Sequence, residues 1–282
     1  MALMRPHLSI LWIFALVNLP VWAEQKTASQ FVRVSEDEKA ARLQTTVTRY
    51  EKEGVVVDLL GAVHIADQAY YEELNRHFRN YEALLFELIG GERLPERRPE
   101  VAAKEGGSPL NEMYAMMRSA MQLSSQMEEV DYWKKNFVHA DLTLAEFEKM
   151  QEARGESLMG FAMASAIESE KSSPATAMDM GAVMRALLTG DANGLKHVMM
   201  KSLGTQDDQL SKLLGESVII DDRNAQCFRV LDAQLGKGRR RLGIFYGAAH
   251  LPDMEKRLWQ RGFRKTGESW LTAWFVPKPE GK

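Results

Sequence analysis

The sequence contains a single cysteine, Cys227, among 282 residues. One thiol excludes internal disulfides and cysteine-based zinc clusters. We expect Cys227 to be a small buried residue on a helix, with a free reactive thiol as the alternative. A chain of this length buries a full apolar core, so folding needs neither disulfides nor a structural metal.

An excess of charge of one sign is also lacking. The chain has 36 Lys and Arg residues against 39 Asp and Glu residues, a formal net charge of −3. Its one run of three basic residues, Arg239–Arg241, lies between a glycine and an expected strand, which favours a solvated turn over a nucleic-acid surface. We therefore expect no nucleic-acid partner.

Long apolar runs are confined to the N-terminus. The run Ile10–Val17 follows Arg5, and Val21 and Ala23 place small or medium residues at the two positions that a signal peptidase reads, which predicts a cleaved export signal over residues 1–23. An uncleaved anchor is the alternative, although the run is shorter than the ~20 residues that a membrane-spanning helix needs. We expect an exported, periplasmic or extracellular protein without a transmembrane segment after signal removal. Residues 24–282 would then form a single domain.

One strand-and-turn motif occurs twice. The stretches Val55–His64 and Leu242–His250 each run from a short apolar strand into Gly-x-x-His. A helical pattern follows both, with Asp67 as a potential N-cap in the first and Pro252 at the first helical position in the second. Each histidine should therefore lie at the carboxyl end of a core strand. Open α/β sheets bind ligands at that edge, so the two histidines could face one cleft.

Another apolar run, Ala83–Ile89, predicts a second core strand. Together with the preceding helix it forms a strand-helix-strand unit, which implies a parallel pair. Glu87 interrupts this run, and a carboxylate there is costly to bury unless it is paired, hydrogen-bonded or bound to a metal. Asp58 raises the same question in the first strand, where its position in the middle of the run favours an edge-facing or a structurally paired role over a role in a site. Other segments predict a hairpin at the sheet edge, a helix and a closing strand: residues 31–52, 218–234 and 270–276.

Residues from about 108 to 215 lack a convincing strand pattern. Leu110, Met113, Met117 and Met121 keep helical spacing, and most of the 16 methionines lie in this stretch. Methionine either fills gaps in a helical subdomain or lines an adaptable apolar groove. The expected fold class is α/β, with a mixed, partly parallel central sheet flanked by helices and an inserted, all-helical, Met-rich cap.

Within this insertion, His139 and Asp141 lie close to the aromatic Trp133. Polar side chains drawn inward with aromatic residues need partners, and the cleft would supply them. We predict that the segment folds over the cleft, with His139 as an extra metal ligand or acid–base group and Asp141 orienting a ligating imidazole. Alternatively, Asp141 enters a helix and His139 is a satisfied core histidine. Arg223 has two readings as well, either an ordinary helix ion pair or a group that binds a carboxylate or oxyanion in the cleft.

Four places in the chain, taken in order and spacing, resemble the TraB/GumN/PrgY family and its Tiki metalloprotease relatives: Gly61–His64, Glu87, Asp222–Asn224 and Gly247–Pro252. The resemblance implies a metal-dependent peptidase site containing His64, Glu87 and His250, with Arg223 and Asn224 close by. The related erythromycin-esterase and ChaN-like groups imply metal-free ester hydrolysis or haem-iron binding instead. Tiki proteins are membrane-anchored at the far end, where this chain has no such segment, so their substrate does not carry over.

Two imidazoles and one carboxylate are a sufficient ligand set for a divalent ion with open positions, which makes a bound water acidic enough to attack a carbonyl. We expect an exported hydrolase that uses Mn, Co or Zn and acts on a peptide or other carbonyl-containing substrate. A metal-free esterase with a histidine as general base is one alternative. A haem-, metal- or peptide-binding protein without catalytic activity is another. The sequence does not determine the oligomeric state.

Overall fold

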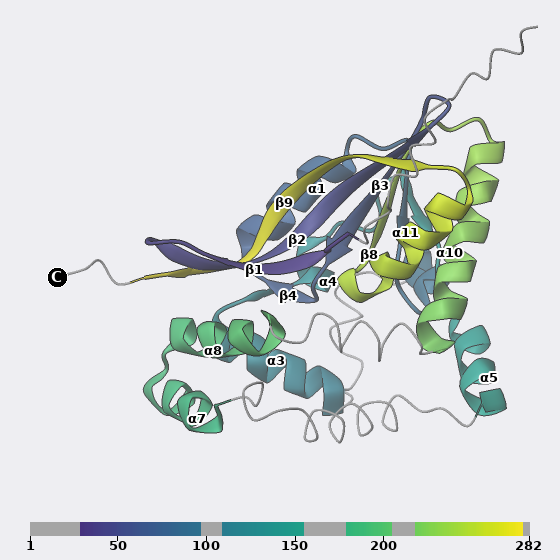
Figure 1. The fold of residues 1–282 in the computed structure, drawn as a ribbon. Helices are drawn as coiled ribbons and strands as arrows, with labels where there is room; N and C mark the ends of the chain where they lie inside the picture. The colour runs from purple at the N-terminus through teal and green to yellow at the C-terminus, as the bar shows by residue number, and fades with distance from the viewer. Residues whose placement is uncertain (1–28, 97–108, 155–178, 205–217, 279–282) are drawn as a thin grey trace, which may run out of the picture.

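The computed structural model describes residues 29–96, 109–154, 179–204 and 218–278. Over this part of the chain a seven-stranded mixed sheet carries helices on both faces (Figure 1). The strand order is β1-β2-β3-β8-β5-β7, and β9 pairs with β2. The strands are β1 Val32–Glu36, β2 Ala40–Lys52, β3 Val55–Ala62, β5 Ala83–Phe86, β7 Phe137–His139, β8 Arg241–Gly247 and β9 Arg264–Pro277.

Four neighbouring strands, β3, β8, β5 and β7, run parallel to one another. The α/β class expected from the sequence is therefore confirmed. The strand-helix-strand unit from β3 to β5 is also present, but β8 lies between its two strands. Close packing at β8 depends on Gly243, since a Cβ there would lie 2.7 Å from Leu84 Cδ1 and 2.8 Å from Tyr81 Cδ2.

The other half of the sheet is antiparallel. As expected, residues 31–52 form a hairpin, β1 with β2. However, β2 is an inner strand, because β9 pairs along its whole length on one side while β1 and β3 share the other. Its run Thr45–Thr48 is buried throughout, as a β-branched strand between two neighbours requires.

Helices cover the sheet on both faces. The α-helices are α1 Gln68–Phe78, α3 Pro109–Met121, α4 Gln126–Glu129, α5 Leu144–Arg154, α7 Met180–Thr189, α8 Ala192–Gly204, α10 Val218–Gly236 and α11 Leu251–Gln260. The 3-10 helices are η1 Gly91–Glu96 and η2 Ala248–His250, and a second, two-stranded sheet pairs β4 Ile65–Ala66 with β6 Ser124–Ser125. In Figure 1, α10 and α11 lie side by side next to β8, and α3, α7 and α8 group together below the sheet.

Each face of the sheet has its own apolar core. On one face, Tyr71, Leu74 and Phe78 of α1 pack in a cluster with Leu84 and Phe245 of the sheet. A separate cluster on the other face contains residues of α10 and α11 together with alternate β8 residues: Cys227, Phe228, Leu231, Leu251, Met254, Leu258, Leu242, Ile244 and Tyr246. Cys227 is thus the buried helical residue expected, and burial raises the pKa of its thiol far above the usual range.

The insertion differs from the expectation in one respect. It is not all-helical, because Ser124–Ser125 forms β6 of the small sheet and Phe137–His139 forms strand β7 at the edge of the main sheet. Three residues are too few to show a strand period, so pairing with β5 decides their conformation. The Met-rich helices α7 and α8 pack against each other, with Met180, Met184 and Leu188 of α7 exposed. The predicted signal peptide lies outside the described residues.

Two aspartates near the sheet have structural partners. Asp58 accepts hydrogen bonds from Arg49 at 2.9 Å and from the Tyr81 hydroxyl at 2.9 Å, so its expected structural pairing is confirmed. Asp67 stands at the N-cap position of α1, but its carboxylate accepts from Lys196 Nζ at 2.7 Å instead of capping the helix.

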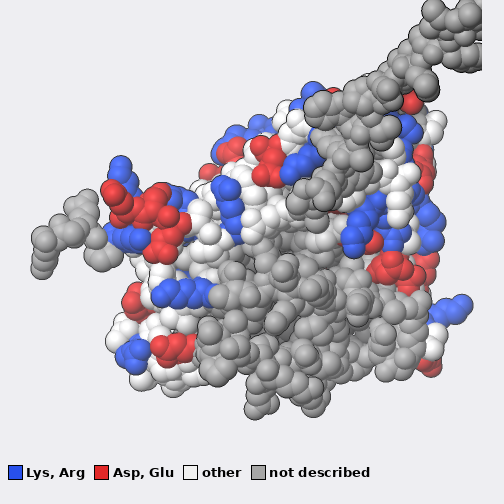
Figure 2. Space-filling view, viewed as in Figure 1, with Lys and Arg blue, Asp and Glu red and all other residues white. Residues whose placement is uncertain are grey.

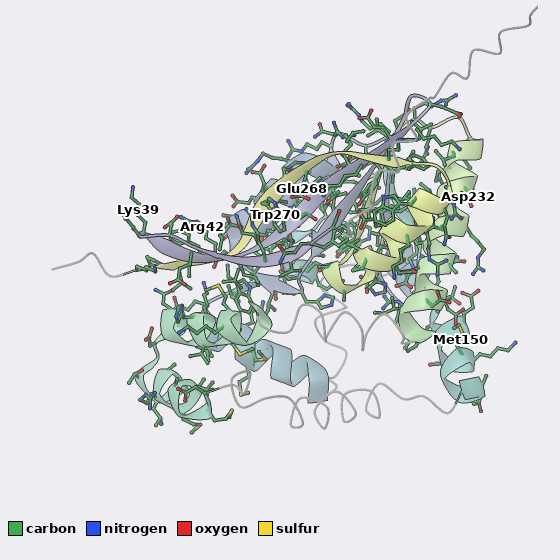
Figure 3. All side chains as sticks on the ribbon, viewed as in Figure 1. Lys39, Arg42, Met150, Asp232, Glu268 and Trp270 are labelled. Atoms are coloured by element: carbon green, nitrogen blue, oxygen red, sulfur yellow. The ribbon has the colours of Figure 1, made fainter. Side chains whose placement is uncertain are left out.

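Acidic and basic side chains are mixed over the visible described surface (Figure 2). Among the described helices, none is long and apolar enough to cross a membrane. In Figure 3, Arg42 of β2 and Trp270 of β9 lie toward the left of the view, and Asp232 of α10 lies at the right.

Candidate active site

An ionisable residue follows the carboxyl end of each of the four parallel strands. His64 follows β3, His250 follows β8, Glu87 follows β5 and Asp141 follows β7. Because parallel strands end at the same edge of a sheet, these residues share the edge where α/β proteins bind ligands. A fifth element, α10, adds Arg223 beside them.

Glu87 is held by two short hydrogen bonds. Its Oε1 accepts from Arg223 Nη2 at 2.6 Å, and its Oε2 accepts from the Gly247 amide at 2.6 Å. Burial by itself would raise the pKa of the carboxyl group, but His250, Arg223, the Gly247 N–H and His64 together lower it to about 2. Glu87 is therefore an ionised carboxylate, and its side chain is 14% exposed.

Arg223 bridges Glu87 to Asp141. Its Nε donates to Asp141 Oδ1 at 2.9 Å and its Nη2 donates to Asp141 Oδ2 at 2.6 Å, the two-point geometry that suits a guanidinium and a carboxylate. The Asp141 side chain is fully buried. Two carboxylates thus face one guanidinium, which leaves this trio with a net charge of −1.

His250 is fixed by Asn224. The Asn224 Nδ2 donates to the His250 carbonyl at 3.2 Å and to Asp253 at 2.9 Å, so its Oδ1 accepts from His250 Nδ1 at 2.7 Å. This tautomer leaves Nε2 without a proton, 3.5 Å from Glu87 Oε1 and 3.5 Å from Arg223 Nη1. Burial lowers the pKa of His250, which keeps its imidazole neutral near pH 7.

His64 is exposed, but the backbone that carries it is tightly bound. Four consecutive or near-consecutive carbonyls of this turn each accept a hydrogen bond: Gly61 from Tyr70 at 2.7 Å, Val63 from Tyr71 at 2.9 Å, His64 from the Gln126 amide at 2.9 Å and Ile65 from Trp274 at 2.8 Å. The imidazole is therefore presented to solvent from a fixed support. It is also among the groups that lower the pKa of Glu87, so it lies within the field of that carboxylate.

His139 has a backbone partner. Its Nε2 lies 2.8 Å from the Leu88 carbonyl oxygen, and its ring packs against Phe86. The structure thus brings His139 to the loop after Glu87, while its predicted role as a ligand or acid–base group stays a prediction. Asp141 likewise contacts Arg223 and the Leu142 amide, where the sequence suggested an imidazole partner.

The donor types at this edge suit a divalent metal. The edge offers two imidazoles, one of which is neutral with a bare Nε2, and the ionised carboxylate of Glu87. The trio of Glu87, Arg223 and Asp141 has a net charge of −1, which favours a cation. In the described part of the chain, however, no group of three His, Cys, Asp or Glu side chains surrounds one point closely enough to hold a metal as they stand. Both oxygens of Glu87 are taken up by Arg223 and Gly247 in this arrangement.

Two contacts at the site are invisible to sequence reasoning. The Arg223–Asp141 pair joins residues 82 positions apart, and the Gly247 amide that binds Glu87 belongs to the backbone. One signal does point to Asp141: it lies two residues from His139, in a short segment that also contains aromatic residues. Comparison of the chain with protein-family models, with curated proteins and with solved structures finds no match.

Proposed function

We propose that the protein is a hydrolase that cleaves a peptide, amide or ester bond at the edge formed by His64, Glu87 and His250. The observation that carries the proposal is the bare Nε2 of a neutral, buried His250, 3.5 Å from the ionised Glu87. A base of this kind is what removal of a proton from an attacking water requires.

The roles follow from the contacts. His250 Nε2 accepts the proton of the water, and the carboxylate of Glu87 stabilises the imidazolium that forms. Arg223 and the Gly247 amide hold that carboxylate in place, and Asn224 holds the imidazole in the required tautomer. His64, exposed at the neighbouring strand end, faces solvent where a substrate carbonyl or leaving group would lie.

The metal-dependent form of the proposal uses the same residues. His64, Glu87 and His250 would hold a Mn, Co or Zn ion, and such an ion supplies a more acidic bound water and polarises a carbonyl. The net charge of −1 in the buried trio supports a cation there. The likeness of the Gly-x-x-His, Glu and Arg-Asn positions to the TraB/GumN/PrgY family and its Tiki relatives supports a peptide substrate. The N-terminal residues support export.

The test is turnover and metal content measured on one preparation purified without chelator. Fluorogenic peptide and chromogenic ester libraries are assayed with the unchanged protein, with Glu87→Gln and with His250→Ala. Glu72→Gln, an exposed residue of α1, serves as the matched carboxylate control. We expect turnover that both site variants reduce at least about 100-fold and the control leaves unchanged.

The metal-dependent form is supported if the unchanged protein holds stoichiometric metal and His64→Ala loses it. Added Mn²⁺, Co²⁺ or Zn²⁺ should then restore the activity of unchanged protein from which the metal has been removed. Full activity in metal-free protein supports direct base catalysis by His250. If Glu87→Gln keeps the turnover of the unchanged protein, the proposed function is wrong.

A further inference from the structure

The loop that follows Glu87 is bound to the segment that contains β7. The Gly90 amide donates to the Leu142 carbonyl at 3.3 Å, and Trp133 Nε1 donates to the Leu94 carbonyl at 3.0 Å. Gly90 has a φ of +75°, a left-handed conformation that favours glycine, so the chain turns sharply back toward β7 at this point. The loop is thus attached at several points to the residues around β7.

Among the contacts between β7 and the loop after Glu87, the one made by His139 is adjacent to Glu87. Its Nε2 lies 2.8 Å from the carbonyl oxygen of Leu88, the residue after Glu87, and the Gly91 amide donates to the same oxygen at 2.9 Å. A carbonyl only accepts, so His139 is the donor and its Nε2 carries the proton. The Leu88 carbonyl therefore has two donors, one from its own turn and one from β7.

Gly91 provides the space for the His139 ring. A Cβ at this position would lie 2.5 Å from His139 Cδ2 and 2.9 Å from Nε2, both shorter than side chains tolerate. The φ of Gly91 is not in the left-handed region, so room for the ring, and not backbone conformation, is what glycine supplies here. The His139–Leu88 hydrogen bond and the glycine at 91 depend on each other.

These contacts fix the backbone on both sides of Glu87. Before it, the Ala140 amide donates to the Phe86 carbonyl at 3.2 Å, and the Glu87 amide itself donates to Phe245 at 3.2 Å. After it, His139 holds the Leu88 carbonyl. The two 2.6 Å bonds of the Glu87 carboxylate leave little room for a backbone shift, since a displacement of a few tenths of an ångström would lengthen at least one of them.

We infer that His139 and Gly91 form a positioning pair, in which the Nε2–H of His139 holds the Leu88 carbonyl and thereby sets the Glu87 carboxylate against Arg223 and the Gly247 amide. His139 then acts through Glu87 and does not contact the reacting atoms. The effect on turnover rests on the proposed function, whereas the effect on the position of Glu87 does not.

The test combines five variants with two readouts. His139→Phe keeps a ring without a donor, and His139→Gln keeps a donor without a ring. Gly91→Ala, His139→Ala and the double variant of the two test the dependence between the two positions. His77→Gln on α1 is the control histidine variant. The first readout is the NMR shift of the Gly247 amide proton, which reports its hydrogen bond to Glu87 without any substrate. The second is the split between kcat and KM.

We expect His139→Phe and Gly91→Ala to move the Gly247 amide proton upfield and to lower kcat roughly tenfold, with KM within about twofold, as a small misplacement of a catalytic group does. His139→Gln should keep both the Gly247 amide proton shift and kcat close to those of the unchanged protein. Gly91→Ala should add little once residue 139 is alanine, because the ring with which it collides is gone and only the 3.1 Å contact with Leu88 Cβ remains.

An unmoved Gly247 amide in both His139→Phe and Gly91→Ala overturns the inference, whatever the turnover. A His139→Gln variant as impaired as His139→Phe overturns the assignment of the hydrogen bond. Should His139→Phe fail to fold, His139→Gln and Gly91→Ala carry the same two readouts. A Gly247 amide that moves as expected in a protein without turnover on any substrate supports the positioning pair and removes the proposed function alone.

Discussion

The two Gly-x-x-His turns have the same sequence motif and the same place in the sheet, yet they differ in burial. After β3 the chain bends at His64 and then enters β4, and His64 is exposed. After β8 it enters a 3-10 helix and then α11, and His250 is only 5% exposed. The motif therefore fixes the edge of the sheet at which each histidine lies, while the element that follows decides whether the imidazole is buried.

The glycines of the two motifs also serve different neighbours. A Cβ at Gly61 would lie 3.4 Å from Leu251 Cδ1 and 3.4 Å from Thr45, both apolar contacts of the core. A Cβ at Gly247 would lie 3.2 Å from Glu87 Oε2, the atom that accepts the Gly247 N–H. The first glycine permits close packing, and the second permits a carboxylate to approach the backbone.

The largest expected effect concerns the buried turn. Arg223→Met removes the cation that pairs with Glu87 and Asp141 and should lower the free energy of unfolding by about 3–5 kcal/mol, because two buried carboxylates lose their partner. Urea unfolding at pH 7 measures it. Arg223→Lys is the control, since it keeps the charge and loses the two-point geometry. Its free energy of unfolding should lie between those of the unchanged protein and Arg223→Met. A loss below about 1 kcal/mol in Arg223→Met would mean that the trio is not held as described.

Acid should act on the buried turn as well. The pKa of Glu87 in the folded protein is about 2, below its usual value of 4.5, so the stability it contributes is present above pH 4.5 and is lost as the pH falls toward 2, a total of roughly 3 kcal/mol. The pKa of His250 is also lowered, here below its usual value of 6.5, so the unfolded chain takes up a proton that the folded chain refuses and stability starts to fall below pH 6.5.

Urea midpoints from pH 7 to pH 3 test this. Glu87→Gln should make the curve less steep below pH 4.5, where Asp37, whose pKa is also lowered to about 2, keeps part of the slope. His64→Ala and Glu72→Gln should keep most of the slope. A Glu87→Gln curve parallel to that of the unchanged protein would contradict the lowered pKa.

The sequence predicts those features whose signals are local. The strands at residues 55–62 and 241–247 and the helices after them follow from apolar runs, glycines and Pro252. Glu87 could be singled out because a carboxylate in an apolar strand needs a partner. Local patterns do not identify the partner itself, since Arg223 binds Glu87 directly from 136 positions away in the chain. Strand β7 was equally hidden, because three residues show no period and only the edge of β5 makes them a strand.

The next largest effect separates the two motif histidines, His250 and His64. His250→Ala should cost about 2 kcal/mol, because it leaves a cavity and an unpaired Asn224 Oδ1 in a buried site. His64→Ala should cost less than about 0.5 kcal/mol, as exposed side chains do. Thermal and urea unfolding of the two variants measure the difference, and equal losses would remove the contrast between the turns.

A further effect, below that of His250→Ala, concerns the support of the exposed turn. Tyr71→Phe removes the hydroxyl that donates to the Val63 carbonyl at 2.9 Å and should cost about 1 kcal/mol, the net value of one hydrogen bond. If His64 contacts substrate, Tyr71→Phe should also lower kcat or raise KM, because the turn that carries His64 loses its fixed position. A variant with unchanged kcat and KM would show that the support does not matter for His64.

The central claim is that both turns act on one carboxylate. The most direct measurement is the NMR titration of the Glu87 side chain in the unchanged protein, in His64→Ala, in His250→Ala and in the control His77→Ala. His64 and His250 are both among the groups that lower the pKa of Glu87, so each of the first two variants should raise that pKa, His250→Ala more than His64→Ala, and the control should leave it unchanged. A Glu87 pKa that does not respond to the loss of His64 would contradict the claim that the two Gly-x-x-His turns share one site.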